Sequence, residues 1–73
     1  MHESAGMIEL RKRMLKYVRT NIDTVCSEEY WQEKITAIIN KCPDDPMQYM
    51  EDHQTLLVRD AMAMHYGVIK TNA

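Results

Sequence analysis

Two cysteines and three histidines are the side chains of this chain best suited to nucleophilic or metal chemistry. Cys26 comes shortly before the expected start of a helix, where the helix dipole lowers the pKa of a thiol and so activates it. Glu28 and Glu29 follow closely and oppose that effect. The sequence places no histidine beside this cysteine. We therefore expect Cys26 to be a small buried side chain and not a nucleophile.

A metal site requires ligands that converge, and the spacing here separates them. His53 and His65 lie twelve residues apart on one expected helix, about 18 Å along its axis. Cys26 and Cys42 flank another helix, which holds them about 24 Å apart, whereas a disulfide requires Cα atoms within about 7 Å. CxxC and HxxxH motifs are absent. The sequence predicts free thiols, no metal and no cofactor, and free thiols are typical of a cytoplasmic protein.

Adjacent carboxylates occur three times, and paired carboxylates can do general acid–base chemistry. Neighbouring residues on a helix point about 100° apart, so such a pair does not share a site. Each pair lies near an expected helix start, where the helix dipole stabilises negative charge. The pairs are Glu28-Glu29, Asp44-Asp45 and Glu51-Asp52. We expect no enzymatic activity.

The clearest functional feature is a row of basic residues on the first expected helix. Residues 1–20 carry five basic and two acidic side chains, a net charge of +3, and residues 21–73 carry four basic and nine acidic ones, a net charge of −5. At about 100° per residue the basic row falls opposite an apolar side. We predict that this basic face binds a partner, an acidic protein in the first instance, through Lys12, Arg13, Lys16 and Arg19.

Two other interpretations of the basic face stay open. Its side chains can be solvated, or paired with acidic residues of the other helices. They can also contact the phosphates of DNA or RNA. Against nucleic acid, the pI of about 5.8 is acidic, where a basic pI is the usual signature. No aromatic residue interleaves with the basic row for base stacking.

Helical periodicity extends through most of the chain and predicts three helices. The first begins near Ser4, a candidate N-cap, and runs to Val25. Arg11 falls within its apolar side, so it either extends its charged end to solvent or forms half of a buried ion pair. The apolar side consists of Met7, Leu10, Met14, Tyr17, Val18, Ile22 and Val25.

The second predicted helix follows the N-cap Ser27 and ends before Pro43, because the residue ahead of a proline avoids the α conformation. A connection of only a few residues favours an antiparallel hairpin with the first helix. We expect the two helices to pack through Leu10, Met14, Val18 and Trp31; the alternative is an exposed Trp31 that anchors a partner. The apolar stripe of the second helix is Trp31, Ile35, Ile38, Ile39 and Cys42.

The third predicted helix has the strongest start signal, Asp44-Asp45-Pro46, in which an Asp N-cap precedes Pro at the first helical position. It runs to about Tyr66, and Gly67 ends it. A break near His53, giving a short helix and then a longer one, is the alternative. The main apolar stripe is Met47, Met50, Leu57, Ala61 and Met64. A second row at heptad spacing predicts a self-association surface made of Tyr49, Leu56 and Ala63.

The sequence as a whole predicts an all-α, single three-helix domain over residues 1–73, with flexible ends at 1–6 and 71–73. A core of this size is marginal, and self-association is a common remedy, so we expect a homodimer. No apolar run approaches the roughly 18 residues of a membrane span, and we expect no membrane partner.

These features favour a small non-enzymatic interaction module: a regulator, adaptor or inhibitor that binds another protein in the cytoplasm. Two alternatives stay open. One is a DNA- or RNA-binding regulator that uses the basic face of the first helix. The other is a minor structural subunit of a larger assembly.

Overall fold

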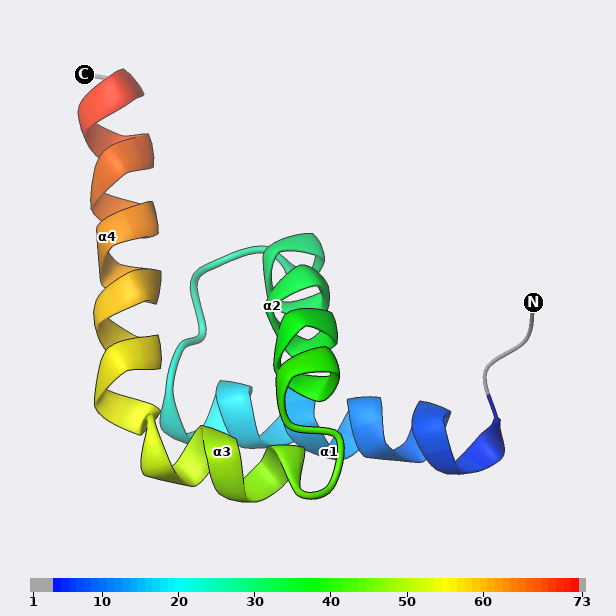
Figure 1. The fold of residues 1–73 in the computed structure, drawn as a ribbon. Coiled ribbons are helices and arrows are strands. Elements are labelled where there is room, and N and C mark those ends of the chain that lie inside the picture. Colours follow the sequence, from blue (N-terminus) through cyan, green and yellow to red (C-terminus); the bar gives the residue numbers. More distant parts are fainter. Residues whose placement is uncertain (1–3, 73) are drawn as a thin grey trace.

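The structure, a computed structural model, describes residues 4–72 and the side chains of residues 4–67. The described residues form no strand and four helices: α1 (Ala5–Asn21), α2 (Glu28–Lys41), α3 (Pro46–Asp52) and α4 (Gln54–Asn72) (Figure 1). The all-α class is confirmed, but the three-helix arrangement is wrong, because the third predicted helix is two helices. None of the described helices combines the length and the apolarity needed to cross a bilayer.

The two ends predicted to be flexible fall partly outside the described residues, which exclude 1–3 and 73. Within the described part, Ser4 caps α1, and Ala5 and Gly6 form its first turn. At the other end, residues 71 and 72 complete α4.

Side-chain caps begin three of the helices where the sequence predicts them. Each cap oxygen accepts a backbone N–H from the residue three positions on, at 3.1–3.2 Å. These bonds satisfy donors that the first turn of a helix leaves without a partner. The caps are Ser4, Ser27 and Asp45.

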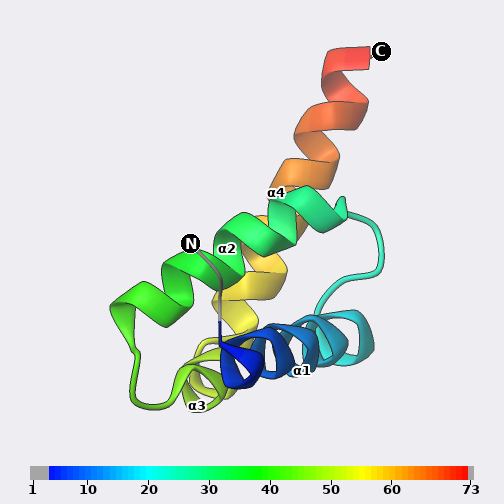
Figure 2. The same cartoon turned by 90° about the vertical axis from the view of Figure 1, so that its right-hand side faces the viewer.

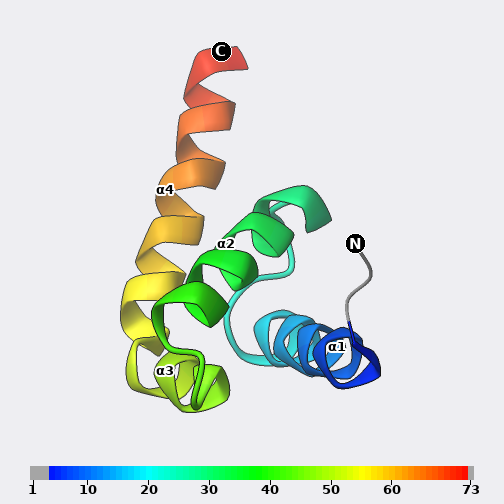
Figure 3. The same ribbon diagram turned by 45° about the vertical axis from the view of Figure 1, so that its right-hand side comes forward.

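The packing of α1 against α2 is crosswise. Figures 2 and 3 both foreshorten α1, whereas α2 runs across the view, so α2 crosses α1 and does not run back beside it. The predicted antiparallel hairpin is therefore wrong. α1 ends at Asn21, four residues before its predicted end at Val25, and the segment 22–27 carries the chain away from α1 before α2 begins.

The core joins all four helices. Met14 and Val18 of α1 and Trp31 of α2 have no exposed surface, so their predicted contact is confirmed and Trp31 is not an exposed anchor. Leu10 packs at the edge and is only half-buried. The largest fully buried side chains are Trp31, Met14, Ile35, Met50 and Val18.

Arg11 of α1 lies against α2 and is half-buried. Its guanidinium donates to Thr36 Oγ1 at 2.9 Å and reaches Gln32 Oε1 at 3.5 Å. Two oxygens of α2 thus hold part of the guanidinium of Arg11 at the boundary between α1 and α2.

His53 separates α3 from α4, which confirms the break offered as the alternative. Its backbone N–H closes the last turn of α3 on the oxygen of Tyr49 at 3.0 Å, and its ring Nδ1 lies 2.9 Å from the same oxygen. The two rings also stack, with centroids 4.0 Å apart. Tyr17 of α1 then holds the start of α4, because its hydroxyl donates to Gln54 Oε1 at 2.8 Å. The chain turns sharply between the two helices (Figure 1).

Only the first half of α4 packs on the body of the molecule. Leu57 and Ala61 are 6% and 2% exposed, whereas every described side chain from Met62 to Gly67 is exposed. Gly67, predicted to end the helix, lies inside it without a positive φ, so that prediction is wrong. The helix continues to Asn72 and projects past the start of α2 (Figure 1). We call the part of α4 from Met62 onward the α4 arm.

Candidate functional site

Three of the four predicted partner-binding cations form an open basic face on α1. Lys12, Arg13 and Lys16 are exposed, and none of them forms an ion pair with another residue that the structure describes. Three cations on one exposed helix face attract an anionic surface at distances up to about a Debye length.

Arg19, the fourth predicted cation, is directed into its own chain. Its Nη1 donates to the backbone oxygen of Asp23 at 3.3 Å and lies 3.6 Å from Asp23 Oδ2. The side chain is 33% exposed. Arg19 thus belongs to the contacts that end α1, and the i, i+4 spacing of Arg19 and Asp23 was a sequence signal for this pair.

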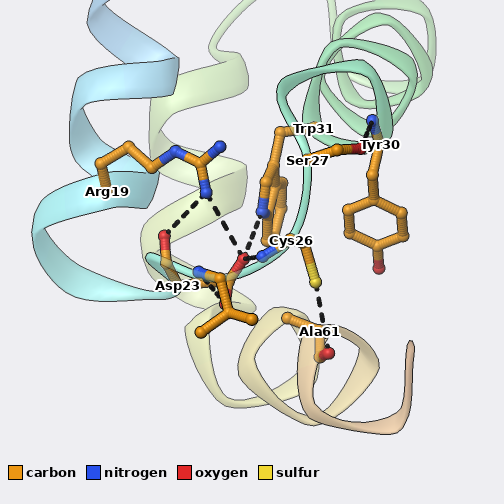
Figure 4. A network of polar contacts seen from close by, with 8 residues as sticks. Arg19, Asp23, Cys26, Ser27, Tyr30, Trp31 and Ala61 are labelled. Atoms are coloured by element: carbon orange, nitrogen blue, oxygen red, sulfur yellow. Dashed lines mark hydrogen bonds and ion pairs between the residues drawn. The ribbon is translucent and has the colours of Figure 1, made fainter. Parts of the chain in front are cut away.

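Asp23 organises the connection between α1 and α2 (Figure 4). Its carboxylate accepts hydrogen bonds from Trp31 Nε1 at 2.7 Å and from the backbone N–H groups of Cys26 and Val25 at 2.8 and 3.0 Å. Burial raises the pKa of Asp23, but these three bonds outweigh burial and hold the pKa below its ordinary value of 3.8. The cluster joins the loop to the centre of the core.

Cys26 is the small buried thiol that the sequence predicts. It is 8% exposed, and its Sγ donates to the backbone oxygen of Ala61 at 3.4 Å (Figure 4). Burial and the neighbouring carboxylate of Asp23 both raise the pKa of the thiol. A raised pKa reduces the thiolate fraction, so this cysteine is poorly suited to nucleophilic attack. Cys26 and Cys42 are both free thiols.

A groove of about 440 Å³ separates the α4 arm from the start of α2. We call it the arm groove. Met64 and His65 form its α4 side, and the 22–27 connection and the first turns of α2 form the other. A smaller hollow of about 210 Å³ on the same arm involves Val25, Met62 and Tyr66. The arm groove is lined by Val25, Cys26, Ser27, Glu29, Tyr30, Glu33, Met64 and His65.

Large apolar side chains around the arm are exposed to solvent. Met62 and Tyr66 are each 66% exposed, Val25 is 57% exposed and Met64 is 47% exposed. Val25 and Met64 belong to the apolar stripes predicted for the first and third helices, but neither is buried. Val25 lies outside α1 because the helix ends early, and Met64 lies beyond the part of α4 that meets the body.

The sequence contains a second signal for this surface besides the apolar stripes, namely a segment without charged residues. From Ala61 to Ile69 the chain has no Lys, Arg, Asp or Glu. Such a helix is apolar around most of its circumference, and a helix of that composition is normally buried on more than one side.

The predicted self-association row is divided between two helices. Tyr49 belongs to α3 and is half-buried, whereas Leu56 and Ala63 are exposed on α4, and Leu56 is 50% exposed. Tyr49 and Leu56 both line a hollow of about 200 Å³, together with Lys41. Ala63 stands two helical turns beyond Leu56 and does not line it.

No three His, Cys, Asp or Glu side chains of the described residues converge as metal ligands do. His53 stacks on Tyr49 between α3 and α4, whereas His65 lines the arm groove in the second half of α4. Comparisons with protein-family models, with curated proteins and with solved structures give no match for this chain. The α4 arm, the arm groove and the basic face of α1 are the surface features that bear on function.

Proposed function

We propose that this chain is a small non-enzymatic interaction module that acts by binding another protein, and that the α4 arm is its main binding element. The observation that carries the proposal is the exposure of Val25, Met62, Met64 and Tyr66 around one projecting helix. Clustered apolar surface of this kind on a soluble domain marks a contact site more often than scattered single residues do. A regulator, adaptor or inhibitor needs no catalytic group to act through such a site.

Capture from a lysate of the native host tests the proposal. The wild-type chain is immobilised beside a variant with Met62→Glu and Tyr66→Glu, which places charge on the apolar arm. A control variant with Thr20→Glu and Asn40→Glu adds the same charge at exposed positions of α1 and α2. We expect the wild type and the control to retain a common protein that the arm variant loses. Equal retention by all three would show that the arm is not the binding element.

Self-association is the second interaction that we propose, through the α4 surface that includes Leu56 and Ala63. A stable interface buries about 800 Å² per partner, more than these side chains supply, so α1 or α2 must contribute surface as well. We expect a homodimer by light scattering on a size-exclusion column at tens of micromolar. Leu56→Glu should give the monomer, whereas Thr55→Glu, an exposed neighbour, should leave the dimer intact. If the wild-type chain elutes as a monomer, this surface does not mediate self-association.

The open basic face favours a second contact with an anionic partner, either an acidic protein or the phosphates of DNA or RNA. Lys12→Glu with Lys16→Glu should leave the helical circular dichroism nearly unchanged, because both side chains are exposed. It should weaken association most at low salt, where charge is least screened. Titration of a labelled DNA duplex at two salt concentrations separates nucleic acid from protein as the partner. If the double variant binds its partner at low salt as well as the wild type does, the basic side chains are solvated and do not contribute to binding.

A further inference from the structure

We infer that the arm groove binds an amphipathic helix of another protein that carries lysine or arginine on its polar side. This inference rests on the proposed function, and it adds the chemistry of the partner. Three observations support it: the apolar side chains that line the groove, the two carboxylates that line it on α2, and the composition of the chain's own helices.

The floor of the groove suits apolar side chains. Val25, Tyr30 and Met64 line it, and they come from three different segments of the chain. A volume of about 440 Å³ lies within the roughly 300–1,000 Å³ typical of binding clefts. An amphipathic helix that lies in such a groove inserts residues spaced three and four apart. The groove therefore has room for the apolar side of one helix.

The edge of the groove is acidic. Glu29 and Glu33 both line it, and they stand one helical turn apart on α2, as i and i+4. Both are exposed, and neither forms an ion pair with another described residue.

Two cations of the neighbouring segments, Lys34 of α2 and Arg19 of α1, pair with other carboxylates. Lys34 Nζ lies 3.3 Å from Asp60 Oδ2, and Arg19 is paired with Asp23. The carboxylates of Glu29 and Glu33 therefore lack a cation from their own chain among the described contacts. An incoming helix with cations one turn apart complements them, whereas an acidic helix is repelled.

A second copy of this chain does not offer such a helix. Its α4 supplies apolar residues, but its cations, Arg59 and Lys70, stand eleven residues apart, about three helical turns, and do not match Glu29 and Glu33, which are one turn apart. Its α1 is basic, but Met14 and Val18 on the apolar side of α1 are fully buried in their own core. The partner for the arm groove is therefore another protein.

The probe for this inference is a labelled helical peptide of about 18 residues, five turns, with leucine on one side and lysine on the other. The control peptide replaces every lysine by glutamate. Binding to the full chain is followed by fluorescence anisotropy. We expect the leucine–lysine peptide to bind at least tenfold more tightly than the control peptide. The amides of Val25, Tyr30 and Met64 should shift in NMR spectra of the complex.

Two matched variants locate the charge effect. Glu29→Gln with Glu33→Gln should weaken the leucine–lysine peptide about three- to tenfold, the effect expected for two exposed ion pairs. Glu51→Gln with Asp52→Asn removes the same charge from the end of α3 and should leave the affinity unchanged. Circular dichroism confirms that both variants fold.

The outcomes separate this inference from the proposed function. Equal weakening by both variants would mean general attraction to an acidic protein and would overturn the inference. Equal affinity for both peptides at the groove would also overturn it, while leaving the arm as a binding surface. Binding of neither peptide would overturn the inference too, and the capture experiment with the arm variant would then decide the proposed function alone.

Discussion

Replacement of Trp31 by alanine is expected to lower the free energy of unfolding by about 3–5 kcal/mol, the cost of removing a fully buried aromatic side chain. Trp31 has no exposed surface and is the largest side chain in the core. Its ring also meets Tyr30 edge to face, with centroids 5.2 Å apart. A domain of this size has a total stability of only about 4–11 kcal/mol, so this loss removes a large part of it. Urea titration followed by circular dichroism measures the loss.

Two further comparisons divide this effect into its parts. Trp31→Phe keeps an aromatic ring in the core but removes the indole N–H that binds Asp23, so its cost should be intermediate. Leu10→Ala should cost less than Met14→Ala, because Leu10 is half-buried and Met14 is fully buried. A loss below about 0.5 kcal/mol for Trp31→Ala would contradict the core described above, since changes of that size are typical of surface positions.

Local signals in the sequence were sufficient to predict where α1, α2 and α3 begin and where α2 ends. Ser4, Ser27 and Asp45 cap their helices through side-chain oxygens, and that chemistry depends only on the next three residues. Lys41 ends α2 two residues before Pro43, as the proline predicts. The buried stripe of α2 was also predictable from its period.

The crossing of α1 and α2 was not predictable in this way. The connection between the two helices is held by Asp23, whose carboxylate binds the side chain of Trp31 eight residues on. Periodicity places Ile22 and Val25 on an apolar side whether or not the helix extends that far. A tertiary contact of this kind leaves no periodic signal in the sequence, and the length of a loop alone does not fix how two helices cross.

The arm was missed for a related reason. Gly67 was interpreted as a helix end, but a C-terminal glycine ends a helix only when the chain adopts a left-handed conformation there. Gly67 has no positive φ, and α4 continues through it to Asn72. Met64 matched the core period, yet the body of the molecule ends near Ala61. Sequence period predicts which side of a helix is apolar, and it does not predict how far the neighbouring helix extends.

Asp23→Ala is the second variant with a large expected effect, a loss of about 2–3 kcal/mol in the free energy of unfolding. The change leaves the N–H of the fully buried Trp31 without an acceptor, and an unsatisfied buried donor costs about 1–3 kcal/mol. It also removes the acceptor for Cys26 N–H and the ion pair with Arg19. Asp23→Asn retains one acceptor oxygen and should lose less. Asp60→Asn is the control, because Asp60 forms an exposed ion pair with Lys34 that contributes at most about 1 kcal/mol.

The contribution of Asp23 should also depend on pH with a definite sign. The pKa of Asp23 is lowered in the folded chain, so the unfolded chain takes up its proton first as the pH falls. The stabilisation is therefore complete above the unfolded pKa of about 4 and decreases as the pH falls below it toward the folded pKa. Urea titrations of the wild type and Asp23→Asn at pH 7 and pH 3 measure this, since other carboxylates affect both chains alike. We expect the stability difference to be smaller at pH 3, because the wild-type carboxylate then begins to lose a charge that the asparagine side chain never carries. A difference that stays constant between the two pH values would mean that the hydrogen bonds of Asp23 do not depend on its charge.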